Sequence, residues 1–395
     1  MTRKLLLQER PSKERRTEAR LPEAPFPILR YILLIFLSSR IALTLIGVTA
    51  HSFLETGYGK QFSWSTYQWL DIWGVWDSFW YMDIVQNGYS SIGSIPESPD
   101  QTNFPFFPLY PLLMRAVGWL TGGQYFLAGL LVSNLCLLIA CYLLYRLVEM
   151  ESDLKTARCS VKYLFLFPVS FIFSGVFTES LYLCLTLLCF YLAKRRQWWL
   201  AGAAGMLLSA TRTLGVLIVL PLAFEYLRSH QFKLRNIRWN SLFLCLIPLG
   251  LMAFSIYSYR ETGDFLYFKT NQAAWDRKIL SPITVLWRAL WQGLSEPHAK
   301  KLLEFCFGLA TLLLLNVGYK KIGFAYWLLG MYSVVIPLAA GIDSIPRYVL
   351  PIFPLFIVLA KMSQNERWDE GLTLFLGILQ GSLMVYWCTG QSLVV

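Results

Sequence analysis

Residues 124–148 read QYFLAGLLVSNLCLLIACYLLYRLV, an apolar run whose one charged residue, Arg146, lies close to its end. A helix of about 20 such residues crosses the roughly 30 Å hydrocarbon core of a bilayer. The run therefore predicts a membrane-spanning helix. Runs of the same kind recur from residues 29–50 to residues 371–388, and mostly short loops separate them. This pattern predicts an all-α, polytopic membrane protein with about eleven spans.

The composition supports the same class. Hydrophobic residues make up 56% of the 395 residues, and the mean hydropathy is +0.48, beyond what a soluble domain can cover with polar surface. The formal charge of +11 would also suit a nucleic-acid-binding protein. The basic residues, however, lie in short loops and in the N-terminal segment, as the positive-inside rule expects. We therefore expect membrane lipids, and no nucleic acid, as partners.

The N-terminal segment differs from the rest of the chain. Residues 1–28 mix basic and acidic side chains and contain no apolar core of a signal peptide. They predict a basic, disordered cytoplasmic tail, and residues 29–395 predict a single membrane-embedded domain. With the N-terminus inside, the first span ends at the outer face, and an odd number of spans leaves the C-terminus outside.

Some of the predicted spans are irregular. The proline-rich residues 105–111 predict an interfacial or re-entrant element rather than the interior of a helix. Two hairpins, at residues 163–196 and 198–238, have arms shorter than a comfortable span of about 20 residues. We expect their helices to reach only part of the way across, sheltered by neighbours. A second polar loop at residues 260–301 contains Asp276 and Arg277.

The most distinctive stretch lies in the polar loop after the first span and reads WDSFWYMD at residues 76–83. A carboxylate is stable in water and costly in hydrocarbon, so acids among aromatic rings beside a bilayer suggest chemistry on a lipid-linked substrate. The predicted topology brings further candidates to the same outer face. The candidates are Asp77 as the catalytic residue and, as substrate-binding residues, Trp76, Trp80, Tyr81, Asp83, Glu179, Arg212 and Arg347.

Structural roles compete with these functional ones. Asp77 precedes a predicted helix at residues 78–85 and would serve as its N-cap. Glu179 would stabilise the positive N-terminal end of the helix that follows it. Arg212 would form an ion pair with Glu179 across the neighbouring hairpins, because a charge between apolar helices needs a partner. Arg347 would only anchor its span at the interface.

The other candidates also have simpler interpretations. Asp83 would be a solvated acid on a helix face, and Trp80 and Tyr81 would belong to the aromatic belt of the membrane surface. Few charges lie mid-span, whereas a transporter needs ionisable groups near the midplane of the bilayer. A lipid or lipid-sugar transporter and a noncatalytic membrane subunit remain the alternatives to an enzyme.

Metal binding is not indicated by the sequence. The three histidines, His51, His230 and His298, are far apart, and the cysteines lie within apolar runs or in a loop without the spacing of a zinc site. We therefore predict no metal and no cofactor.

Five segments, in order along the chain, resemble one known family. They read WDSFWYMDIVQNGY (76–89), FPFFPLYPLLMR (104–115), FPVSFIFSGVFTESLY (167–182), ATRTLG (210–215) and SIPRYVLPIFPLF (344–356). From about Leu29 to Lys361, the chain is similar to the second mannosyltransferase of GPI-anchor synthesis. Eukaryotic relatives often have His where this chain has Trp80 or Tyr81. This departure suggests that the chain is a distant relative of prokaryotic type.

The resemblance implies a membrane glycosyltransferase of the GT-C type. Its donor would be polyprenyl-phosphate mannose, and its acceptor a lipid-linked or glycan hydroxyl on the periplasmic, extracellular or ER-lumenal face. The carboxylate that such enzymes use as a base in the first outer loop corresponds to Asp77. Arg212 and Arg347 are suited to the leaving phosphate, because a planar guanidinium can hold phosphate oxygens with two hydrogen bonds. The sequence identifies no protein partner.

Overall fold

The computed structural model describes residues 23–93, 100–275, 279–295 and 299–393. Within these ranges the elements are helices, and no strand is present. The predicted all-α fold is confirmed. The predicted tail up to residue 22, together with Asp276, Arg277 and His298, lies outside the described residues.

Five helices in the described part are long and apolar enough to cross a membrane, which makes this an integral membrane protein. They are α1 (Pro25–Phe53), α5 (Tyr125–Glu151), the continuous helical segment Trp239–Thr262 that ends in α10 (Leu249–Thr262), α13 (Ala299–Ile322) and α17 (Glu366–Cys388). The count of about eleven spans stays a prediction. The other predicted spans are shorter helices, which agrees with the expectation of hairpins with short arms.

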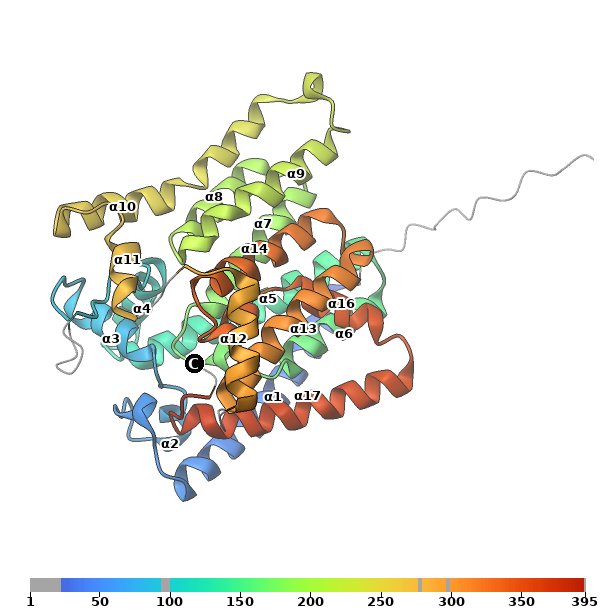
Figure 1. Ribbon diagram of the computed structural model, residues 1–395. Helices are drawn as coiled ribbons and strands as arrows, with labels where there is room; N and C mark the ends of the chain where they lie inside the picture. The colour runs from blue at the N-terminus through green and yellow to red at the C-terminus, as the bar shows by residue number, and fades with distance from the viewer. Residues whose placement is uncertain (1–22, 94–99, 276–278, 296–298, 394–395) are drawn as a thin grey trace, which may run out of the picture.

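One row of helices runs through the whole bundle. α17 packs on α1, α1 on α5, α5 on α7 (Glu179–Lys194), and α7 on α8 (Trp198–Ser209). Figure 1 shows this row, with α17 at one side of the molecule and α8 and α10 at the other. Since α5 and α7 lie inside the row, their faces are buried on several sides, and α7 is almost wholly enclosed.

A second layer covers this row. It consists of α6 (Leu154–Leu166), α9 (Val219–Ser229), α12 (Pro282–Ser295), α13, α14 (Phe324–Ala340) and α16 (Pro354–Met362). Here α6 packs on α16, α16 on α13, and α13 on both α12 and α14, while α9 joins α14 to α7. α12 packs against its neighbours through one apolar face, on which Val285 and Ala289 are buried. Trp287 and Trp291 of the same helix are exposed.

The chain between α6 and α7 is broken inside the bundle. α6 ends at Leu166, a 3₁₀ helix covers Ser170–Ser174, and α7 begins at Glu179. Inside a membrane, backbone carbonyls that leave a helix need other donors. Gln380 of α17 supplies them: its Nε2 donates to Phe165 O at 2.7 Å and to Phe167 O at 3.0 Å. The same nitrogen lies 2.6 Å from Ser170 Oγ, and the Ser170 hydroxyl itself donates to Phe165 O at 2.6 Å.

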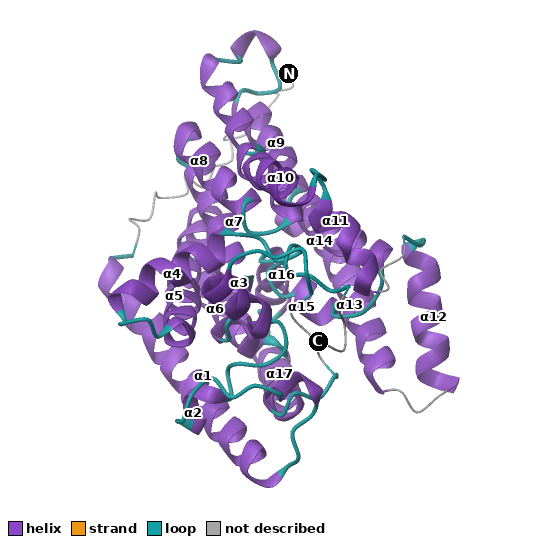
Figure 2. Ribbon diagram, turned by 90° about the vertical axis from the view of Figure 1, so that its left-hand side faces the viewer, coloured by secondary structure: helices purple, strands orange, loops and turns teal. Residues whose placement is uncertain are grey.

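Several short helices gather at one end of the bundle, which we call the site end. They are α2 (Gln68–Asp71), α3 (Ser78–Asn87), α4 (Leu109–Leu120), α11 (Tyr267–Thr270) and α15 (Ile345–Val349). Figure 2 looks on to this end and shows α3 and α15 near the centre of the view. The helix α4 starts only at Leu109, so most of the proline-rich run 105–111 lies in the turn before it. Pro111 falls in the first turn, where proline is tolerated.

Candidate active site

Asp77 is the last residue before α3 and lies at the site end. Its side chain makes no capping hydrogen bond to α3, so the N-cap interpretation is wrong. Instead the carboxylate is paired with the guanidinium of Arg347, which stands on α15. The Asp77 side chain remains 24% exposed. It is therefore a carboxylate that a substrate can reach.

Glu179 is the first residue of α7, and its side chain is fully enclosed (0% exposed). It accepts hydrogen bonds from both Arg212 and Arg347. Burial raises the pKa of this carboxyl, but the two guanidinium groups more than offset that effect, so its pKa lies below the ordinary value. The positive end of the α7 dipole acts in the same direction. Glu179 is thus a buried anion between two cations.

Arg212 lies between α8 and the following 3₁₀ helix, Thr213–Ile218. The predicted ion pair with Glu179 is confirmed, and Arg212 Nε also donates to Thr178 Oγ1 at 2.9 Å. The guanidinium lies 5.7 Å from the ring centre of Tyr182, within the range of a cation–π contact. These contacts hold one face of the guanidinium against α7.

Arg347 is the link between the two carboxylates. Burial lowers the pKa of its guanidinium, yet Asp77 and Glu179 hold that pKa well above its ordinary value. Its side chain is buried and lies 4.7 Å from the ring centre of Phe177. The interpretation of Arg347 as a surface anchor is wrong, because its charge is directed into the bundle. The four side chains form an alternating, neutral row: Asp77, Arg347, Glu179, Arg212.

Trp80 and Tyr81 stand on α3 behind Asp77. Both are buried, which rules out the aromatic-belt interpretation. Trp80 stacks on Phe106 with ring centres 5.5 Å apart. The Tyr81 hydroxyl lies 3.3 Å from Thr178 Oγ1, the atom that accepts from Arg212. Tyr81 is therefore linked to the ion row through Thr178, whereas Trp80 packs α3 against Phe106.

Trp76 has an unusual backbone. Its φ is +50°, in the left-handed region that residues with a side chain rarely adopt. The Trp76 amide donates to Gly59 O at 2.8 Å, and a Cβ on Gly59 would come within 2.2 Å of the Trp76 ring. Residues in such strained conformations are held by their surroundings and often lie at functional sites. The close approach of Gly59 fixes the peptide that precedes Asp77.

Asp83 belongs to a different polar group from the ion row. It is buried, so the prediction of a solvated acid is wrong. Its carboxylate accepts from Asn103 Nδ2 at 2.7 Å and from Asn87 Nδ2 at 2.9 Å. Asn103 also donates to Gly88 O at 2.9 Å. Asp83 thus ties the end of α3 to the segment that leads to α4.

Glu304 supports the turn that carries Arg347 and was not among the residues predicted from the sequence. Glu304 is buried in the first turns of α13. It accepts from the Ser344 amide at 3.2 Å and from Lys301 Nζ at 3.3 Å. Ser344 has a left-handed φ of +64° and precedes α15. A lone acid at the start of an apolar run, three residues after a lysine, is the signal that could have found it.

Arg40 was also missed, although it is a charged residue in the middle of the run 29–50. It is buried, donates to Ser170 O at 3.3 Å and lies 5.5 Å from the ring centre of Phe165. The accepting carbonyl belongs to the first residue of the 3₁₀ helix that follows α6, and the ring belongs to the last turn of α6. Arg40 therefore has a structural role at the break between α6 and α7.

Known proteins resemble this chain in fold. No family model and no curated protein sequence matches it. ArnT from Cupriavidus metallidurans, in a structure bound to undecaprenyl phosphate, superposes with a TM-score of 0.53 and 12% identity over 87% of this chain. The match covers 62% of ArnT, so this chain spans under two thirds of that protein.

Two structures of the oligosaccharyltransferase of Archaeoglobus fulgidus are more distant. One is tethered with an acceptor peptide (TM-score 0.45, 13% identity, 90% of this chain and 55% of the other). The second, named AglB, is in complex with an inhibitory peptide and a dolichol-phosphate (TM-score 0.43, 13% identity, 90% and 56%). The likeness to ArnT extends over most of this chain, which therefore has the same all-helical fold as ArnT.

Proposed function

We propose that this protein is a membrane glycosyltransferase. It transfers a hexose, mannose, from a polyprenyl-phosphate-linked donor to a lipid-linked or glycan acceptor on the outer face of the membrane. Asp77 acts as the general base. The observation that carries this proposal is the contrast within the ion row: Glu179 is sealed in the bundle, whereas Asp77 stays accessible beside it. An accessible carboxylate held in one orientation by a buried arginine is what base catalysis at a fixed position needs.

The reaction that we propose is an inverting transfer. The Asp77 carboxylate takes the proton of the acceptor hydroxyl as that oxygen bonds to the anomeric carbon. The bond between the anomeric carbon and the phosphate oxygen breaks on the opposite face, and its electron pair leaves with the lipid phosphate. Charge therefore builds on that phosphate in the transition state, where fixed cations stabilise it.

Arg212 and Arg347 supply this stabilisation in the proposal. Arg347 donates through Nε to Glu179 and through Nη1 to Asp77, and Arg212 donates through Nε to Thr178 and through Nη2 to Glu179. The other terminal nitrogen of each side chain is then directed to phosphate oxygens. Because Glu179 holds both groups, they do not have to reorganise when charge develops, which is how preorganised sites lower barriers.

The alternative base, Asp83, is less suited to this role. Its carboxylate is buried and accepts from two asparagine amides, which leaves it less reachable than Asp77. Trp76 and Tyr81 then serve as the wall that keeps water from the acceptor oxygen, and Trp80 supports α3 behind them. The fold shared with ArnT, whose structure holds a lipid phosphate, supports a donor of the same chemical kind.

The first test is donor recognition. Purified protein in vesicles is given synthetic polyprenyl-phosphate mannose labelled in the sugar, with a lipid extract of the host as the source of acceptor. Labelled lipid or glycan product is the expected result. An Arg212→Lys variant should bind the donor at least tenfold more weakly while its affinity for the acceptor changes little, since lysine loses the planar fork. Bound donor without product under all acceptor conditions would favour a noncatalytic subunit or a flippase.

A further inference from the structure

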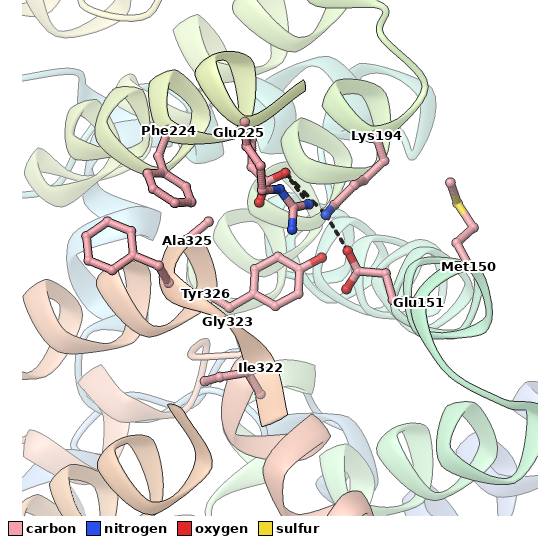
Figure 3. Close-up of a pocket in the computed structure, with 11 residues that line it drawn as sticks. Met150, Glu151, Lys194, Phe224, Glu225, Ile322, Gly323, Ala325 and Tyr326 are labelled. Carbon is pink, nitrogen blue, oxygen red and sulfur yellow. Dashed lines mark hydrogen bonds and ion pairs between the residues drawn. The ribbon is translucent and has the colours of Figure 1, made fainter. Parts of the chain in front are cut away.

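A second group of charged side chains lies at the end of the bundle opposite the site end. The helix α7 carries Glu179 at its first residue and Lys194 at its last, about 22 Å apart along the axis at 1.5 Å per residue. Around Lys194, the ends of α5 and α7 meet α9 and the start of α14. They enclose a pocket of about 390 Å³, shown in Figure 3.

The charges that line this pocket cancel. Lys194 pairs with Glu151 and with Glu225, the latter at 3.2 Å, and Arg228 pairs with Glu225 at 2.7 Å. Lys194 and Glu225 are the inner members of this group. The outer members are Glu151, 30% exposed, and Arg228, 51% exposed. The pocket therefore presents one accessible carboxylate and one accessible guanidinium, with no net charge.

A polar atom deep in the pocket, the Tyr326 hydroxyl, lies beside the Glu151 carboxylate. The Tyr326 side chain is buried, and in Figure 3 its hydroxyl is directed towards Glu151 and Lys194. Among the residues that the structure describes, this hydroxyl makes no hydrogen bond of acceptable geometry. Buried hydroxyls normally have a partner, so the atom is suited to a polar group of a ligand.

The remaining wall of the pocket is apolar. Phe224 and Phe324 face each other with ring centres 4.6 Å apart, and Ile322 and Met150 continue the wall. Met150 and Phe324 are exposed on the outside of the bundle, at the helix ends that mark a membrane surface. A molecule with a polar head and an apolar body can enter this pocket sideways from the lipid.

We propose that this pocket binds the headgroup of a zwitterionic aminophospholipid, phosphatidylethanolamine being the simplest. Arg228 holds the phosphate, because a guanidinium and a phosphate form paired charge-assisted hydrogen bonds. The primary ammonium donates to Glu151 and to the Tyr326 hydroxyl. The acyl chains lie against Met150 and Phe324. This proposal is independent of glycosyl transfer at the site end.

The net charge and the hydroxyl distinguish this ligand from other lipids. An anionic headgroup such as phosphatidylglycerol leaves the Glu151 carboxylate facing like charge, which is unfavourable in a partly buried site. A quaternary ammonium, as in phosphatidylcholine, has no N–H to donate to the Tyr326 hydroxyl. Selectivity for a primary ammonium therefore follows from the residues of the pocket.

The experiment is native mass spectrometry of the full-length protein after delipidation, with equal amounts of phosphatidylethanolamine, phosphatidylcholine and phosphatidylglycerol added back. We expect one molecule of phosphatidylethanolamine to be retained at least tenfold more strongly than the other lipids. Glu151→Gln and Arg228→Gln should each remove this preference. Tyr326→Phe, which keeps the ring and its packing, should weaken it severalfold. Soluble phosphoethanolamine, added as a competitor, should displace the lipid only at much higher concentration.

Arg195→Gln is the matched control, because Arg195 is an exposed arginine at the same end whose Nη1 donates to Tyr191 Oη at 3.2 Å. It should retain the full preference. Equal retention of the three lipids by the wild-type protein would overturn the proposal. An unchanged lipid preference in both Tyr326→Phe and Glu151→Gln would also overturn it, provided that each variant is folded, as judged by a monodisperse elution peak. Displacement by phosphoethanolamine as readily as by the lipid would overturn it too, and would identify a soluble ligand instead.

Discussion

Replacing Glu179 by glutamine tests the ion row as a structural and electrostatic unit. The substitution preserves shape and leaves one oxygen to accept a hydrogen bond, but it removes the one carboxylate that pairs with both arginines. Arg347 keeps Asp77 as a partner, so the cation that loses its only ion pair in the described residues is Arg212. Removing one partner of a buried ion pair costs about 3–5 kcal/mol. Since Glu179 is fully enclosed and Arg212 is 16% exposed, we expect a loss of about 3 kcal/mol.

The assay is the free energy of unfolding in mixed micelles, followed by tryptophan fluorescence during titration with a denaturing detergent. The control is Arg158→Gln, which breaks an ion pair to Glu23 on a half-exposed arginine and should cost less than about 1 kcal/mol. The double variant Glu179→Gln with Arg212→Gln should recover part of the loss, because the uncompensated cation is gone. If Glu179→Gln costs no more than the control, or if the double variant is no better than the single one, the reasoning is refuted.

Three further substitutions test how the site is supported. Gln380→Leu removes an amide group with two N–H donors from the helix break; Phe167 O loses its donor, whereas Phe165 O keeps the Ser170 hydroxyl. It should cost about 2 kcal/mol of unfolding free energy, at about 1 kcal/mol per lost hydrogen bond. The exposed control Gln364→Leu should change it by less than about 0.5 kcal/mol, and similar losses for both would contradict this role of Gln380. Gly59→Ala forces the ring of Trp76 to move and should lower the transfer rate about tenfold or more. The control Gly371→Ala, with open space around the residue, should leave the rate unchanged. Equal rates for the two variants would show that the close approach of Gly59 to Trp76 does not position the base. Glu304→Leu should lower kcat about tenfold with KM for the donor little changed. Glu304→Gln should retain most of the wild-type rate, because glutamine can accept the same backbone hydrogen bond from Ser344. If Glu304→Gln is as slow as Glu304→Leu, Glu304 does not act by holding this turn.

The sequence was informative wherever a property is local. Apolar runs predicted helices close to those observed, as for residues 29–50 within α1 and 124–148 with α5. The carboxylate beside aromatic rings and the arginine of the second hairpin were likewise recognised from nearby residues. Their grouping at one end followed from the alternation of spans. The number of spans could not be fixed, because helices of 9 to 17 residues, such as α16 and α14, do not reveal from composition alone how deep they reach.

The remaining features depend on contacts between distant residues. Arg347 and Asp77 are 270 positions apart, and nothing near either residue predicts that the arginine orients the carboxylate. Gln380 looked like a single polar residue in a span, and only the packing of α17 on the broken segment shows which carbonyls it satisfies. Asp83, Trp80 and Tyr81 were judged by their residue types as surface candidates. Tertiary burial overrode that tendency, as it often does for amphipathic aromatics and hydrogen-bonded acids.

The most direct test of the central proposal is a single-turnover measurement of sugar transfer by the wild-type protein and by Asp77→Asn, with donor binding determined on the same samples. Asparagine keeps the size of the side chain but cannot take a proton. We predict unchanged donor binding within about threefold and a rate lower by about two to four orders of magnitude, the usual contribution of a general base. A variant that binds donor normally and transfers sugar at the wild-type rate would contradict the assignment of Asp77 as the base.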